Sequence, residues 1–400
     1  MSRLLFLGLT LVCSAFADVK ALASSGLITN SKRTLHMLEP DVIIYTNDIS
    51  FKPDAKLSQN YFEYVVAEDY KNTLVDLTVF AVSNVDEPLH FEKLDSSKLY
   101  SKSLARFNET DFIWYRLDIT EMMKESRDGQ VHLQIKEYHK RRRTPFPESI
   151  TLKTAQTMEF FDSQYLLSPY EVEKQVTLYM LEAHRIIMFK ETESVKQVKE
   201  GIRYGPFKNT PPFSFELIRL LFEYNDPQLL LTRATKTYTV SHWGNINVDE
   251  HFELENVGAK LKGEFSRVDY DYLRKGDNCL KQISAEYPSY IQGMYFHDYV
   301  GNISSTNAFR DKEAGKVSLN YRTRFPVCGG WKVDWNQGFN MPTKYHLASD
   351  EEKKDGFILE VGFFHGYDVL LAEDYSVNVV LPYGAYDIEV RITMTNLMTD

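Results

Sequence analysis

Side chains that alternate between apolar and polar recur along most of this chain, and this pattern restricts the fold more than any other feature. Alternation with period two places the apolar side chains on one face of a β-strand. Helical periodicity is scarce and is confined to two short candidates, Phe215–Tyr224 and the polar segment Thr192–Glu200. Many strands without regular intervening helices predict a mostly β fold built from β-sandwich-like domains with few short helices. The clearest alternating runs are Val75–Phe80, Phe112–Ile119, Val131–Ile135, Val176–Met180, Lys236–Val240, Val317–Tyr321, Phe357–Val361, Val377–Leu381 and Ile388–Ile392.

The chain is long enough for two such domains, since a domain takes roughly 150 residues. Glycine and proline cluster between residues 200 and 212, at Gly201, Gly205-Pro206 and Pro211-Pro212. These residues interrupt regular elements. We therefore expect an N-terminal β-rich domain over residues 18–205 and a second β-rich domain over residues 206–400.

The first 17 residues have the composition of a secretory signal peptide. Arg3 supplies a positive charge, Leu4–Cys13 is apolar, and Ala15-Phe16-Ala17 offers small residues to a signal peptidase. We expect cleavage after Ala17, with a buried N-terminal strand or helix as the alternative. Beyond residue 18 no apolar run approaches the ~18–20 residues of a membrane helix, so we expect a soluble luminal chain.

Cysteines and glycosylation sequons fit that destination. Cys13 would leave with the signal peptide, and Cys279 and Cys328 would remain. An oxidising lumen permits one disulfide between them, while two buried free thiols are the alternative. Asn108-Glu109-Thr110 and Asn302-Ile303-Ser304 are sequons, so Asn108 and Asn302 are candidate glycan acceptors if they are exposed.

Charge argues against nucleic acid as a partner. The formal net charge is −10, whereas nucleic-acid binders need a broad basic face. The one dense basic run is His139-Lys140-Arg141-Arg142-Arg143. It could bind anionic headgroups or an acidic partner, but its position between a strand and two prolines favours a solvated hairpin loop.

Two fragments could belong to a hydrolase, His297-Asp298 and His365-Gly366-Tyr367-Asp368, because each pairs a base with a carboxylate. The sequence has no GxSxG or SxxK motif to supply the nucleophile, and neither CxxC nor HExxH to bind zinc. We therefore expect no catalytic residue, no cofactor and no metal.

A series of strings in fixed order resembles ribophorin I, subunit 1 of the eukaryotic oligosaccharyltransferase. The resemblance is specific from about residue 204 to 391, and Pro145-Phe146-Pro147 and Tyr165–Tyr170 extend it towards the N-terminus. The strings are Tyr204-Gly205-Pro206-Phe207, Val240–Ile246, Gly258–Arg267, Asp298–Ser304, Arg324-Phe325-Pro326, Gly329-Gly330-Trp331-Lys332, Gly338–Pro342 and Val379–Ala385.

This resemblance implies a type I membrane subunit of the endoplasmic reticulum with two β-rich luminal domains. The complex transfers an oligosaccharide from dolichyl diphosphate to asparagine in Asn-x-Ser/Thr, and a different, polytopic subunit catalyses the transfer. The implied partners are the other subunits, including the catalytic one, with nascent polypeptides and the translocon nearby. By resemblance, Asn302 falls where the family carries a sequon.

The family's membrane helix and cytosolic tail are expected to be absent from the sequence, which ends at Asp400. We therefore expect a non-catalytic subunit with a structural or substrate-handling role. The alternative is a soluble luminal or secreted β-sandwich binding module that is no longer attached to the complex.

Overall fold

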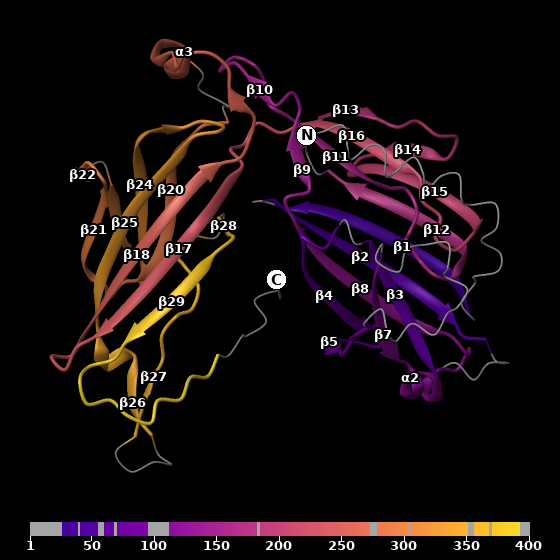
Figure 1. Ribbon diagram of the computed structural model, residues 1–400, viewed down its shortest axis with the longest axis horizontal. Helices are drawn as coiled ribbons and strands as arrows, with labels where there is room; N and C mark the ends of the chain where they lie inside the picture. Colours follow the sequence, from indigo (N-terminus) through magenta and orange to yellow (C-terminus); the bar gives the residue numbers. More distant parts are fainter. Residues whose placement is uncertain are drawn as a thin grey trace. The chain divides into compact units, whose positions relative to one another are not determined.

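In the computed structural model the chain divides into two compact units, Met1–Asn225 (unit 1) and Asp226–Asp400 (unit 2). Both are built almost entirely from β-strands (Figure 1). The structure therefore confirms the mostly β class. It describes residues 26–38, 41–54, 60–67, 70–94, 112–181, 185–272, 278–304, 306–311, 313–350, 356–367 and 370–392.

Unit 1 is organised around an eight-stranded sheet in the order β14-β15-β12-β1-β2-β8-β4-β5. Neighbours are antiparallel except β1 and β12, which run parallel, so that Leu27 pairs with Glu171. Its strands are β1 (Leu27–Leu38), β2 (Val42–Lys52), β4 (Leu74–Ala81), β5 (Asn84–Leu89), β8 (Val131–Lys140), β12 (Glu171–Met180), β14 (Val195–Val198) and β15 (Gly201–Thr210).

Two smaller sheets pack on one face of this large sheet and give unit 1 its sandwich-like layers. In β2 the buried side chains are at positions 43, 45, 47, 49 and 51, which places them on the same face. One small sheet packs on Ile43 and Tyr45, and the other packs on Ile49 and Phe51. They are β13 (Ile186–Phe189), β16 (Leu217–Glu223), β11 (Thr157–Ser163) and β9 (Arg143–Pro145), and then β3 (Tyr61–Ala67), β7 (Phe112–Asp118) and β6 (Glu92–Leu94).

Unit 2 is a second sandwich. A seven-stranded sheet, in which both β28 and β29 pair with β17, packs on a three-stranded sheet through a core containing Phe252, Trp335 and Tyr321. The first sheet contains β22 (Gly301–Asn302), β21 (Gln292–Asp298), β25 (Lys332–Pro342), β18 (Asn245–Asn256), β17 (Leu229–Val240), β28 (Leu371–Ala372) and β29 (Tyr375–Val380), and the second contains β20 (Leu280–Pro288), β24 (Lys316–Val327) and β23 (Asn307–Asp311).

Short elements complete the described part of the chain. A hairpin of β26 (Leu347–Ser349) and β27 (Phe357–Leu359) belongs to unit 2. The remaining elements are β10 (Ser149–Ile150), β19 (Lys260–Leu261), α2 (Thr120–Glu125), α3 (Arg267–Tyr272) and the 3-10 helix η5 (Thr343–Tyr345).

Three of the expected elements are wrong. Phe215–Tyr224 and Thr192–Glu200 are not helices, because they contain the strands β16 and β14. In β16 the side chains of Ile218, Leu220 and Phe222 are buried in alternation, so tertiary packing decides the structure. Ile388–Ile392 has the pattern of a strand but forms none.

The division between the units falls at Asn225 rather than at residue 205, where the sequence places it. Gly205-Pro206 lies inside β15, which pairs with β12. After β15 the chain forms β16, which pairs with β11 and β13 in unit 1. The residues from Gly201 to Pro206 therefore lie within a strand and do not end the domain.

Some sequence predictions lie outside the described residues, namely the signal peptide over residues 1–17, Asn108 and Asp368. Among the residues that the structure describes, no helix has the length and apolar character needed to cross a membrane.

Candidate functional site

The predicted glycan acceptor Asn302 is exposed at the edge of unit 2. It lies on β22 and pairs with His297 of β21 across a tight turn. The backbone N–H of the next residue, Ile303, donates to the carbonyl of Phe296 at 3.0 Å. Ser304, the third residue of the sequon, is also exposed. The exposure that a sequon requires is therefore present at Asn302, while glycan occupancy stays a prediction.

Asp298 holds the turn that precedes this sequon. Its carboxylate accepts backbone N–H donations from Val300 and Gly301, each at 3.0 Å. Arg324 of β24 donates to the same carboxylate through Nε at 2.6 Å and Nη2 at 2.8 Å. Hydrogen bonds from Arg324 and these backbone groups lower the pKa of Asp298 to about 2.

The contacts of the two histidines give the hydrolase interpretation no support. His297 directs Nδ1 to the backbone carbonyl of Asp298 at 3.4 Å, and the Asp298 carboxylate is bound to Arg324 instead. His365 accepts the N–H of Tyr367 at 3.2 Å, and its ring contacts Phe252 and Tyr375. Both histidines therefore have structural partners.

The basic run at residues 139–143 is not a solvated loop, and it is not a basic surface either. His139 ends the inward row of β8 and is fully buried, and Arg143 on β9 is 4% exposed. The guanidinium of Arg143 donates to Asp41 at 2.8 Å. Arg142 donates to Tyr45 and lies with its guanidinium carbon 3.8 Å from the centre of the Tyr70 ring. Three of the five basic residues therefore stabilise the interior of unit 1.

Two of these residues, His139 and Arg142, belong with Arg33, Asn47, Glu137 and Asp162 to a buried polar belt that divides the core of unit 1. Arg33 of β1 lies 3.0 Å from Asp162 of β11, and also donates to the Ser163 carbonyl at 2.7 Å. Both charged side chains are less than a tenth exposed. The belt lies between the apolar clusters under the two small sheets, because Asn47 separates Tyr45 from Ile49 along β2.

Glu137 is the second acidic centre of the belt. It accepts hydrogen bonds from Tyr64 at 2.5 Å and Asn47 at 3.1 Å, and lies 2.9 Å from Nε2 of His139. Burial raises its pKa, but the hydrogen bonds from His139 and Tyr64 outweigh burial and leave the pKa below its usual value. For Arg33, burial acts to lower the pKa, but the charge of Asp162 together with Tyr179, Tyr45 and Glu137 outweighs burial and leaves the pKa raised. Both groups are therefore held in their charged forms.

Unit 2 has a smaller cluster of the same kind. Lys236 of β17 lies opposite Glu250 of β18, with Nζ and Oε1 3.4 Å apart, and both are buried. Glu250 also accepts from Gln337 at 2.7 Å and Tyr287 at 3.0 Å. Burial first, and then the negative charge of Glu250, raise the pKa of Tyr287 well above its usual value.

Sequence reasoning missed both clusters, although a signal for them exists. Val131, Leu133 and Ile135 form the inward row of β8, and Glu137 and His139 continue that row. Lys236 and Glu250 occupy corresponding positions within apolar rows of β17 and β18. A charged residue at an inward position of a strand indicates a buried partner on a neighbouring element.

The family model for ribophorin I matches residues 28–399. The chain belongs to the ribophorin I family. Its relatives include dolichyl-diphosphooligosaccharide–protein glycosyltransferase subunit 1 of Caenorhabditis elegans, 31% identical over 72% of this chain and 49% of the relative. Subunit 1A of Arabidopsis thaliana is 34% identical over 62% of this chain and 40% of the relative. The chain spans about half the length of the curated relatives it matches.

Some solved structures resemble this ribophorin I family member weakly. The C-terminal domain of the Streptococcus pyogenes antigen I/II-family protein AspA covers 79% of the chain and 91% of its own length, at 8% identity. Its TM-score is 0.24, which is too low to support an argument.

The structure joins Cys279 and Cys328 of this ribophorin I family member in a disulfide. Both cysteines are buried, and they connect the segment before β20 to the residue that follows β24. Among the described residues, no group of three potential metal ligands comes together.

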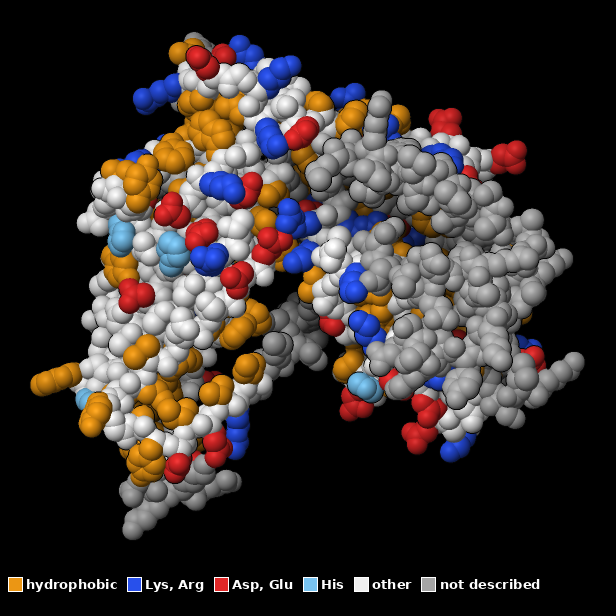
Figure 2. Space-filling model, viewed as in Figure 1, with side chains coloured by type: hydrophobic (Ala, Val, Ile, Leu, Met, Phe, Trp, Pro, Cys, Tyr) orange, Lys and Arg blue, Asp and Glu red, His pale blue; other side chains and the backbone are white. Residues whose placement is uncertain are grey.

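Figure 2 shows hydrophobic side chains at the end of unit 2 that carries the β26–β27 hairpin, and several of the exposed ones are aromatic. Trp243, at the tip of the β17–β18 hairpin, is 95% exposed, and Tyr383 beyond β29 is fully exposed. Nε2 of His242 lies 3.3 Å from the Tyr383 carbonyl, and Thr343 donates its N–H to the Gly244 carbonyl at 3.0 Å. The loops at this end are thus fixed to one another while their aromatic rings remain accessible. We name Trp243, Tyr345 and Tyr383 the aromatic end of unit 2.

Proposed function

We propose that this chain is a non-catalytic subunit of an oligosaccharyltransferase in the endoplasmic reticulum, with a structural or substrate-handling role. The complex would transfer an oligosaccharide from dolichyl diphosphate to asparagine in Asn-x-Ser/Thr of nascent proteins. The family match over residues 28–399 carries this proposal, together with relatives that are named as subunit 1 of that glycosyltransferase.

The contacts of the buried charged groups support an accessory role. Glu137 and Asp162 are held by His139 and Arg33 inside unit 1, and Glu250 is held by Lys236 inside unit 2. Groups bound in this way stabilise a sandwich and do not face a substrate. The aromatic end of unit 2 offers the amphipathic rings that are enriched at protein interfaces.

Three features support a luminal location. Asn302 is an exposed sequon, Cys279 and Cys328 form a disulfide, and the first 17 residues resemble a signal peptide. Disulfides persist in oxidising compartments such as the lumen of the endoplasmic reticulum. The Asn302 glycan would then be a product of the chain's own complex and not part of its mechanism.

The test is a pull-down of the tagged chain from detergent-solubilised endoplasmic reticulum membranes, probed for the catalytic subunit. We expect recovery of the catalytic subunit, and reduced glycosylation of some acceptor proteins when the chain is depleted. Unchanged glycosylation of all acceptors after depletion would contradict the handling role. Recovery of the chain in the medium without the catalytic subunit would favour the soluble binding module instead.

A pair of matched variants tests whether the aromatic end of unit 2 contacts the catalytic subunit. Trp243→Ser with Tyr383→Ser removes two rings of the aromatic end, whereas Phe309→Ser removes an exposed ring from β23. We expect the double variant to recover less catalytic subunit than the Phe309→Ser control. Equal recovery would show that the aromatic end is not the contact.

A further inference from the structure

The segment Ile388–Ile392 has the sequence pattern of a strand but has no pairing strand among the described residues. Ile388, Val390 and Ile392 alternate with charged residues and are 62%, 81% and 65% exposed. β-branched side chains in alternation fit a sheet with one buried face. Exposed together, they indicate a surface that is completed by another strand.

An open sheet edge lies next to this segment in the chain. β29 pairs with β17 along one side, and none of the described strands pairs with its other side. Its inward row is Tyr375, Val377 and Val379, of which Tyr375 and Val377 pack on the core of unit 2 and Val379 is 44% exposed. An edge with unpaired backbone groups and an apolar row is a template for a further strand.

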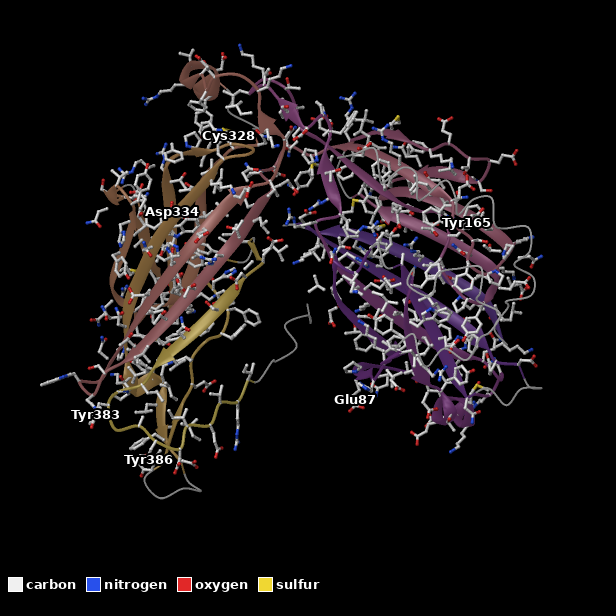
Figure 3. The ribbon with its side chains drawn as sticks, viewed as in Figure 1. Glu87, Tyr165, Cys328, Asp334, Tyr383 and Tyr386 are labelled. Atoms are coloured by element: carbon white, nitrogen blue, oxygen red, sulfur yellow. A yellow bond between two sulfur atoms is a disulfide. The ribbon has the colours of Figure 1, made fainter. Side chains whose placement is uncertain are left out.

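The chain between the two segments already reverses its direction. A turn closes where Ala385 donates its N–H to the Pro382 carbonyl at 3.3 Å, and Tyr383 is held at its carbonyl by His242. After this turn the chain runs in the direction opposite to β29, and it is separated from that strand (Figure 1). Tyr383 and Tyr386 mark the reversal in Figure 3. Only residues 381–387 separate β29 from Ile388–Ile392, so a short connection joins the two segments.

We propose that Ile388–Ile392 docks on the free edge of β29 as a displaceable antiparallel strand. One register places all three apolar side chains on the inward face, with Ile388 opposite Val379, Val390 opposite Val377 and Ile392 opposite Tyr375. In this register Glu389 lies opposite Asn378 on the outward face. A shift of one residue would expose the whole apolar row, so the pattern selects this pairing.

The docked strand would act as a cover for the sheet. Docking buries the apolar row and pairs the edge, while ordering the segment costs conformational entropy of a similar size. The structure shows the undocked arrangement, in which Val379 and the edge of β29 are accessible to an extended polypeptide. Unit 2 would therefore alternate between a closed and an open sheet edge. This inference is independent of the proposed enzyme complex.

Disulfide trapping in the full chain tests the register. Asn378→Cys with Glu389→Cys places two thiols opposite each other on the outward face, at the Cα separation that directly opposed residues have in antiparallel sheets. Asn378→Cys with Val390→Cys is the control, because its thiols lie on opposite faces. Under mild oxidation we expect the first pair to cross-link at least about tenfold faster than the control. Equal rates, or no cross-link in either pair, would overturn the proposal.

Hydrogen exchange provides a second test without new cysteines. We expect Val390→Asp to undock the segment and to speed exchange of the β29 amides that point to its free edge roughly threefold or more, with β18 unchanged. Exchange in β29 that stays slow in this variant would mean that something other than residues 388–392 covers the edge, and would refute the docked strand.

Discussion

The guanidinium of Arg33 and the carboxylate of Asp162 lie 3.0 Å apart inside unit 1, between two apolar clusters. A buried ion pair gains stability only where its remaining donors and acceptors are also bonded. Arg33 meets this condition through the carbonyls of Ser163 and Tyr165, and Asp162 through the hydroxyls of Tyr70 and Tyr179. The network is therefore sensitive to the loss of a single member.

Asp162→Ala should destabilise the protein by about 3–5 kcal/mol, because it leaves the Arg33 guanidinium buried without its main counter-charge. Urea unfolding followed by circular dichroism measures this change. The control is Glu286→Ala, which removes the exposed partner of Lys316 at 2.8 Å and should cost at most about 1 kcal/mol. A similar loss of stability in both variants would contradict a stabilising role of the buried polar belt.

The low pKa of Asp298 predicts that the free energy of unfolding depends on pH. Its pKa falls to about 2 in the folded state, against roughly 3.9 for an unfolded aspartate. The group therefore contributes stability above about pH 4, and this contribution is lost as the pH falls towards 2. Comparing urea midpoints of the wild type and Asp298→Asn at pH 5, 3 and 2 should show a difference that shrinks with acid. A difference that is constant with pH would exclude this titration.

At the scale of single elements, alternation predicted most strands but misjudged segments whose neighbours decide the outcome. Phe215–Tyr224 is so apolar that helix and strand periods both fit it, and only pairing with β11 and β13 selects the strand. For Ile388–Ile392 the prediction of a strand is wrong for the opposite reason. Its alternating pattern is clear, but none of the described strands pairs with it. The local pattern indicates which side chains of a segment suit a buried face. Long-range pairing determines whether the segment forms a strand.

Alanine substitutions along β16 should follow a period of two. Leu220→Ala should cost about 2–5 kcal/mol, because its side chain is fully buried and leaves a cavity. Leu221→Ala, on the opposite face and half-buried, should cost clearly less. Both variants would be measured by urea unfolding at neutral pH. Equal losses at the two positions would argue against the strand.

The site shows the same division between what sequence can and cannot predict. Asn302 could be named as a candidate from the sequence because a sequon is a local motif. The partners of Asp298 and Lys236 were not found, because Arg324 reaches Asp298 through a contact between sheets and Glu250 reaches Lys236 through strand pairing. His139 appeared to belong to a surface run because its buried environment comes from elements far away in the sequence.

At the scale of the whole molecule, the boundary between the units can be tested by proteolysis. A protease site inserted between Asn225 and Asp226 should be cut readily and leave two folded products. A site inserted after Gly205 should be cut slowly, because it lies within β15. Gel electrophoresis and circular dichroism of the products measure both outcomes. Faster cleavage after Gly205 would restore the boundary expected from the sequence.

The parallel pairing of β1 with β12 also affects the order in which unit 1 can be completed. Leu27 pairs with Glu171, so one side of β1 has no neighbour until most of the unit has been synthesised. At the usual pace of translation, that interval is roughly 7–30 s. During it, β1 and β2 can form a hairpin, but one edge of β1 stays open to other chains. Until β12 has been synthesised, this open edge of the nascent chain is therefore a template for pairing with another polypeptide.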